Sequence, residues 1–156
     1  MVTVTKYLTQ IDLKRKICDC KNDEKLKILF KEVSESELRV KPEQGMSGAY
    51  ILRNEKIIVS CEHCKKVYFI MTTFEGGIKE QYINIDSLEV FDGSIRELRQ
   101  IINSMFDDYE SDIITVATDD HTIKVLEKYE DDEKIMTRYA YLNREDKDLY
   151  KDLMED

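Results

Sequence analysis

Four cysteines, Cys18, Cys20, Cys61 and Cys64, constrain this chain more than any other feature of its sequence. Cys61-Glu-His-Cys64 has the C-x2-C spacing with which a tight turn directs two thiolates at one tetrahedral zinc ion. Cys18-Asp-Cys20 supplies a second pair. The N-terminus lacks the apolar stretch of a signal peptide, so we expect these thiols in a reducing cytoplasm, where a metal site is favoured over two disulfides. The sequence therefore predicts one structural zinc site with four sulfur ligands.

The C-x2-C turn lies between two strand-like segments, Ile57-Ile-Val and Val67-Tyr-Phe-Ile-Met, and this arrangement resembles half of a zinc ribbon. The other pair departs from that pattern because its spacing is tighter and it lacks the usual Gly or Pro, so no family is assigned. His63 could replace one sulfur ligand. Cysteines packed in the core as small apolar side chains, and redox pairing, are the remaining alternatives. A metal with four protein ligands has no open position for water and stabilises the fold.

The hydrophobic pattern predicts a single α+β domain over residues 1–156. Leu26, Ile28 and Phe30 alternate with lysines, which is the two-residue period of a half-buried strand. We expect turns at residues 34–37 and 53–56, and a loop at residues 42–48, where the only proline of the chain stands. Short strands between these turns would form a small antiparallel sheet that carries the cysteines.

One amphipathic helix is the clearest single element. Ser94-Ile-Arg-Glu97 is a capping box, and apolar residues then recur three and four positions apart from about Ile95 to Phe106. Strand patterns at residues 113–117, 123–129 and 134–142 predict a three-stranded meander. Asn143 could cap a closing helix. No apolar run approaches the ~20 residues that cross a bilayer, so we expect no membrane contact.

Charge divides the chain into two halves. Residues 1–72 hold 14 Lys and Arg against 10 Asp and Glu, a net charge of +4, whereas residues 73–156 hold 10 against 23, a net charge of −13. Basic residues flank both cysteine pairs: Lys14, Arg15, Lys16, Lys65 and Lys66. The acidic half contains the run Glu130, Asp131, Asp132 and Glu133. Such a half repels nucleic acid and attracts basic protein surfaces.

Three functions remain open. The first is a non-enzymatic, zinc-stabilised interaction or regulatory protein that binds a basic protein partner through the acidic run, as an inhibitor or a recruiter. The second is a nucleic-acid-associated zinc module, such as a transcription accessory factor, that uses the five basic residues near the cysteines. The third is a hydrolase in which carboxylates hold a divalent metal. Asp119-Asp120-His121 is the nearest approach to such a site, but these residues are also typical of a hairpin turn, so no catalytic residue is assigned.

Overall fold

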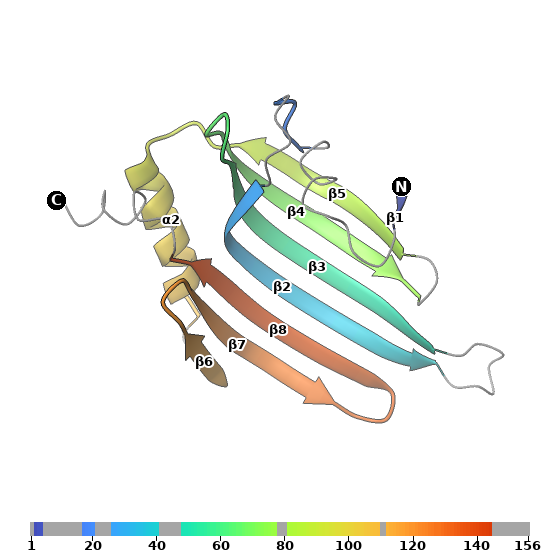
Figure 1. Cartoon of the computed structure of the whole chain (residues 1–156). Coiled ribbons are helices and arrows are strands. Elements are labelled where there is room, and N and C mark those ends of the chain that lie inside the picture. Colours follow the sequence, from blue (N-terminus) through green and yellow to red (C-terminus); the bar gives the residue numbers. More distant parts are fainter. Residues whose placement is uncertain are drawn as a thin grey trace.

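One antiparallel sheet forms most of the structure. The computed structural model describes residues 2–4, 17–20, 26–40, 48–77, 81–109 and 112–144 (Figure 1). Within these residues, eight strands pair in the order β1-β5-β4-β3-β2-β8-β7-β6. Their bounds, with that of helix α2, are β1 Val2–Val4, β2 Leu26–Val40, β3 Gly48–Cys61, β4 Val67–Gly76, β5 Gln81–Val90, α2 Ile95–Asp107, β6 Ile114–Ala117, β7 His121–Glu130 and β8 Lys134–Asn143.

The expected α+β arrangement, with small sheets, a central helix and a closing helix, is therefore wrong, because the described strands form one antiparallel sheet. The predicted C-terminal meander exists as β6, β7 and β8, but β8 pairs with β2 from Phe30↔Leu142 to Leu38↔Lys134, which joins the meander to the rest of the sheet. No local sequence pattern indicates such pairing between distant segments. The closing helix expected after Asn143, like the loop expected at residues 42–48, lies mainly outside the described residues.

Two predicted turns are also wrong, because β2 and β3 run through them without a break. Residues 34–37 pair with residues 51–54, and Lys56 pairs with Glu32. These polar residues favour turns in the sequence pattern because a strand inside a domain is expected to have one apolar face. In this part of the sheet most side chains on both strands are at least partly exposed, so polar residues are tolerated on both faces.

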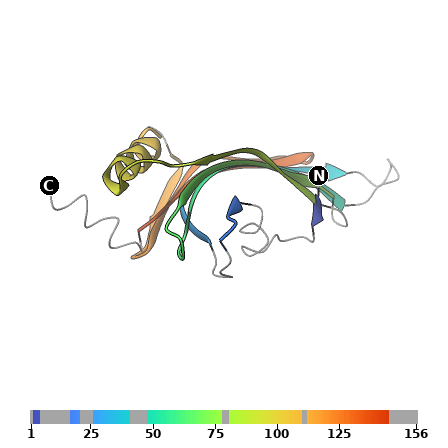
Figure 2. The ribbon, with the colours of Figure 1, turned by 90° about the horizontal axis from the view of Figure 1, so that it is seen from above.

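The sheet carries a separate apolar core on each face. Figure 2 shows a curved sheet with α2 on its convex side and residues 17–20 on its concave side. Neighbouring strand residues divide between the faces, since Ile58 packs in the core with α2 whereas Ile57 and Val59 pack in the core with Cys18. Both cores lie near the same end of the sheet, where the β3–β4 turn and α2 are found (Figure 1).

Helix α2 confirms the prediction from the capping box. The Ser94 side chain accepts a hydrogen bond from the Glu97 backbone amide at 3.1 Å. Leu98, Ile102 and Phe106 are buried against the convex face. At the other end of the helix Lys124 of β7 donates a hydrogen bond to the Phe106 carbonyl at 3.2 Å, where a cation also suits the negative end of the helix dipole. The buried apolar face and the hydrogen bond from Lys124 thus fix the helix to the sheet.

No helix in the described part of the chain has the length and apolar character needed to cross a membrane.

Candidate metal centre

The turn between β3 and β4 positions two of the cysteines. Cys61 is the last residue of β3, and Cys64 lies within the turn before Val67 begins β4. Two backbone hydrogen bonds close the turn, from the Lys65 amide to the Cys61 carbonyl at 2.8 Å and from the Cys61 amide to the Lys66 carbonyl at 2.9 Å. Lys65 takes a left-handed conformation, with φ of 64°. The predicted hairpin around C-x2-C is therefore confirmed.

All four sulfur atoms come together at this turn. The Sγ atoms of Cys18, Cys20, Cys61 and Cys64 lie within 4.8 Å of one another, and those of Cys18 and Cys64 are 3.6 Å apart. Four sulfurs around a tetrahedral zinc, with Zn–S near 2.3 Å, would be about 3.8 Å apart. Cys18 and Cys61 are buried, whereas Cys20 and Cys64 are partly exposed. The cluster thus has the donor set and the spacing to hold one metal ion.

Backbone amides favour ionisation of one of these thiols. Burial raises the pKa of Cys61, but hydrogen bonds from the amides of Cys64 and His63 and from the neighbouring thiols outweigh burial and lower the pKa to about 7. For Cys64, burial and the nearby Cys61 and Cys18 sulfurs raise the pKa to about 11, although the Lys66 amide lowers it. Cys61 therefore ionises more readily than Cys64, and a bound cation would favour the thiolate form of both.

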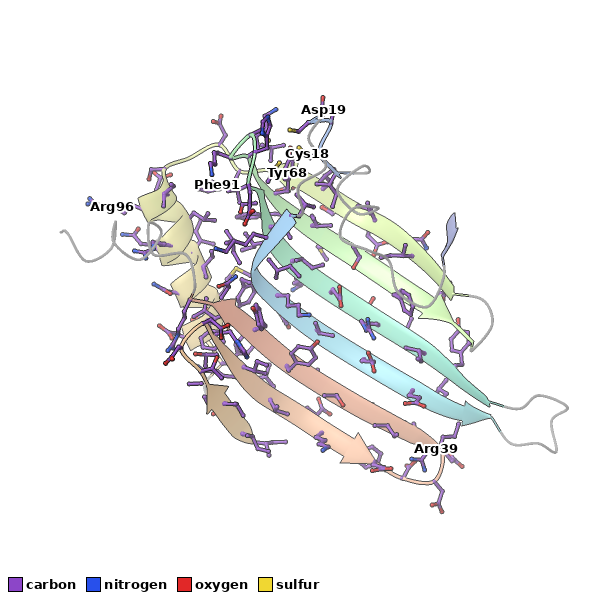
Figure 3. All side chains as sticks on the ribbon, viewed as in Figure 1. Cys18, Asp19, Arg39, Tyr68, Phe91 and Arg96 are labelled. Atoms are coloured by element: carbon purple, nitrogen blue, oxygen red, sulfur yellow. The ribbon has the colours of Figure 1, made fainter. Side chains whose placement is uncertain are left out.

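Tyr68 was missed as part of this site. Burial and a hydrogen bond to Cys18 raise the pKa of Tyr68 above its ordinary range, so the hydroxyl stays protonated and donates to the sulfur. Figure 3 shows Cys18 and Tyr68 together at this end of the sheet. The sequence carried a signal, because a hairpin closed at C-x2-C pairs Tyr68 with Val59 and so places it on the same face as Cys61.

The basic residues predicted beside the cysteines are described only in part. Lys65 and Lys66 are exposed in the turn, whereas Lys14, Arg15 and Lys16 lie outside the described residues. His63 is exposed and does not belong to the group of four metal-binding candidates.

The acidic run lies far from the cysteines, at the end of β7 and in the β7–β8 turn, at the opposite end of the sheet (Figure 1). Glu130 pairs with Arg39 at 2.6 Å, and Figure 3 shows Arg39 at that distant end. The Asp131 carboxylate accepts hydrogen bonds from the Glu133 and Lys134 amides, both at 2.8 Å, and from the Tyr129 hydroxyl at 2.6 Å. At least two of the four acidic residues therefore also hold the turn and its neighbours in place.

Asp119 and Asp120 lie in the β6–β7 turn and His121 begins β7, which confirms the predicted hairpin. The Thr118 amide donates to the His121 carbonyl at 2.8 Å. His121 Nδ1 lies 2.7 Å from Asp120 Oδ1, and the imidazole stacks on Tyr141 with ring centroids 5.5 Å apart. A hydrogen bond from the Thr118 hydroxyl, followed by the one from His121, lowers the pKa of Asp120. Each of these contacts stabilises the turn.

In comparisons with known proteins, the chain matches no protein-family model, no curated protein and no solved structure.

Proposed function

We propose that this protein is a non-enzymatic binding protein, stabilised by one structural zinc ion, that recruits or inhibits a basic protein partner. The observation that carries the zinc assignment is the group of four sulfurs within 4.8 Å of one another. Cys18, Cys20, Cys61 and Cys64 would hold the metal, and their thiolates suit zinc, which four-sulfur structural sites commonly contain. Four protein ligands leave no position for water, which favours a structural role over a catalytic one.

Bound zinc would attach residues 17–20 to the concave face of the sheet. Cys18 belongs to the segment 17–20, whereas Cys61 and Cys64 belong to the β3–β4 turn, so the metal would join parts of the chain 46 positions apart. Ile17 and Cys18 pack with Leu26, Val59 and Tyr68 in the concave core. Removing the metal would therefore weaken this core as well as the turn, since binding free energy at such a site is folding free energy.

The partner assignment rests on charge. The chain carries a net charge of −9, and residues 73–156 alone carry −13. A field of this sign speeds association with a basic protein and opposes contact with nucleic acid. A basic protein is therefore preferred to nucleic acid as the partner.

Metal analysis tests the zinc assignment. We expect about one zinc per chain, and Cys61→Ser should lose the metal and lower the free energy of unfolding by several kcal/mol. His63→Ala is the matched control from the same turn and should keep the metal. Protein purified without chelator that contains no zinc would refute the assignment, and loss of zinc in His63→Ala alone would show that a nitrogen replaces one sulfur.

Cross-linking in the source cell, followed by mass spectrometry, tests the partner assignment. The expected partner has a basic contact surface, and its association with the purified chain should slow as salt rises, because electrostatic steering is screened. Sub-micromolar binding of the chain to duplex or single-stranded nucleic acid at physiological salt would contradict the proposal.

A further inference from the structure

We propose that the outer edge of β6 binds an extended segment of the basic partner, which adds to the sheet as a further antiparallel strand. This inference rests on the proposed function and assigns its contact surface to β6, in place of the acidic run at residues 130–133 that the sequence suggested. It concerns the opposite edge of the sheet from β1, and within the described residues β6 pairs with β7 alone. Partners that bind in this way gain affinity from main-chain hydrogen bonds and specificity from alternate side chains.

The β6–β7 hairpin determines which backbone groups face outward. Because the Thr118 amide donates to the His121 carbonyl, and hydrogen-bonded pairs alternate in an antiparallel ladder, the next such pairs are Val116 with Ile123 and Ile114 with Val125. The amides and carbonyls of Thr115 and Ala117 therefore point away from β7. They form a short row of donors and acceptors that matches an incoming strand.

The side chains of this edge also suit a partner strand. All four residues of β6 are exposed, and the exposed fractions are 59% for Ile113, 50% for Ile114 and 49% for Val116. Sheet edges in soluble proteins usually carry Lys, Pro or a bulge that prevents pairing. Residues 113–118 read Ile-Ile-Thr-Val-Ala-Thr and contain neither a charge nor a proline. The Ile113 amide donates to the Val125 carbonyl at 2.7 Å although Ile114 is the residue opposite Val125, so the edge bulges at its start; from Ile114 to Thr118 it is apolar or β-branched and carries no charge.

The concave face extends this apolar surface inward from the edge. Ile114 lies opposite Val125, which lies opposite Tyr139, and Val116 lies opposite Ile123. Directly opposed residues share a face, so Ile114 and Val116 continue the surface formed by their neighbours on β7 and β8. A bound strand would place every second side chain against Ile114 and Val116, which predicts apolar, β-branched residues at alternate positions of the partner segment.

Charge at both ends of the edge selects a basic occupant. Asp112 precedes the apolar segment, and Asp119 and Asp120 follow it in the β6–β7 turn; all three are exposed. A second copy of this chain would bring the same carboxylates together, which is unfavourable for like charges on adjacent strands. Lysine or arginine on either side of the partner's apolar residues would instead meet opposite charge.

A synthetic peptide provides the first test. The probe is a capped peptide of alternating valine and threonine with two lysines at each end, and its control has glutamates in place of the lysines. We expect the lysine peptide to bind the zinc-loaded chain and to protect the Thr115 amide from hydrogen exchange, and the glutamate peptide to bind at least about tenfold more weakly. Equal binding of both peptides, or protection elsewhere, would overturn the proposal.

Variants of the edge provide the second test. Thr115→Pro removes an outward amide without removing a β6–β7 hydrogen bond, so it should weaken peptide binding by about tenfold or more, whereas Thr115→Ser keeps the amide and hydroxyl and should bind normally. Circular dichroism and zinc content establish that each variant is folded. If Thr115→Pro does not fold, Val116→Lys keeps the backbone intact and should weaken binding by repelling the lysines.

The cellular partner separates the two proposals. If the partner found by cross-linking binds Thr115→Pro and Val116→Lys as well as the parent chain, the edge is not its site, although the proposed function stands. If no basic partner is found, the proposed function fails. Concentration-dependent dimerisation that Thr115→Pro abolishes, without binding of the lysine peptide, would assign the edge to a second copy of this chain and overturn the inference.

Discussion

Individual residues stabilise the β3–β4 and β7–β8 turns, and among them Lys65 has the most unusual backbone conformation. It follows Cys64 in the β3–β4 turn and is a non-glycine residue with a positive φ, 64°. The left-handed region costs an L-residue roughly 1–2 kcal/mol, and glycine usually occupies such positions. The hydrogen bond from its amide to the Cys61 carbonyl, at 2.8 Å, helps to retain this conformation.

Replacing Lys65 by glycine should therefore stabilise the protein. Lys65→Gly removes the side-chain clash of the left-handed conformation, but it also makes the unfolded chain more flexible, so we expect a net gain of at most about 1 kcal/mol. The urea midpoint of zinc-loaded protein measures it. Lys66→Gly, the neighbouring control, should be neutral or destabilising. A clear loss of stability in Lys65→Gly would show that the lysine side chain contributes a contact that outweighs the backbone strain.

Asp131 organises the opposite turn, and its pKa makes this contribution depend on pH. Hydrogen bonds from the Tyr129 hydroxyl and then from the Glu133 and Lys134 amides lower the pKa of Asp131. A carboxyl whose pKa is lowered by folding contributes stability above its unfolded pKa of about 3.9, and that stability is lost as pH falls through the lower folded value.

Asp131→Ala should accordingly be less stable than the parent chain at pH 7, and the difference should shrink as pH falls below about 4. Urea midpoints at a series of pH values provide the measurement. Asp132→Ala changes the next carboxylate in the same turn and is expected to have a smaller effect. A difference between Asp131→Ala and the parent that stays constant down to pH 2 would assign the effect to packing instead.

Among the helices and strands, those that depend on local sequence could be predicted. The helix was predictable because a capping box and a three-and-four periodicity coincide in residues 94–106. The C-x2-C hairpin was predictable because the cysteine spacing requires a turn. The sequence predicts β2 and β3 to be shorter than they are, because their polar halves lack the apolar alternation on which strand prediction depends. The pairing of β2 with β8 could not be predicted, since it joins distant segments and no local sequence pattern indicates it.

Helix α2 offers a test of the convex core. Leu98 is 1% exposed and packs with Ile102 and Phe106, so Leu98→Ala should leave a cavity and cost about 2–5 kcal/mol. Ser94→Ala removes the cap and should cost about 1 kcal/mol. Guanidinium denaturation measures both. Because the cysteines lie on the other face, zinc content should remain unchanged in both variants, and a Leu98→Ala chain as stable as its parent would contradict the packing of α2.

At the scale of the whole molecule, both cores cover the same end of one sheet, and the other end is covered on neither face by a described element. Strand β3 shows this gradient along its own length. Ile57, Ile58 and Val59 are at most 6% exposed, whereas Leu52 is 37% exposed and its neighbours Ile51 and Arg53 are partly exposed. Backbone pairing is the same at both places, since β2 and β4 flank β3 throughout Ile51–Ser60.

Hydrogen exchange can separate the effect of this cover from that of backbone pairing. Local opening requires less free energy where few apolar contacts must be broken, so amides of residues 51–53 should exchange faster than those of residues 57–59, although both segments lie in a central strand. If the proposed zinc is bound, its chelation should raise exchange at residues 57–59 and make the exchange rates of the two segments more similar, because residues 57–59 lie beside the cysteines. Equal protection along β3 in the metal-loaded protein would mean that the sheet opens as one cooperative unit, with backbone pairing rather than the two cores setting its stability.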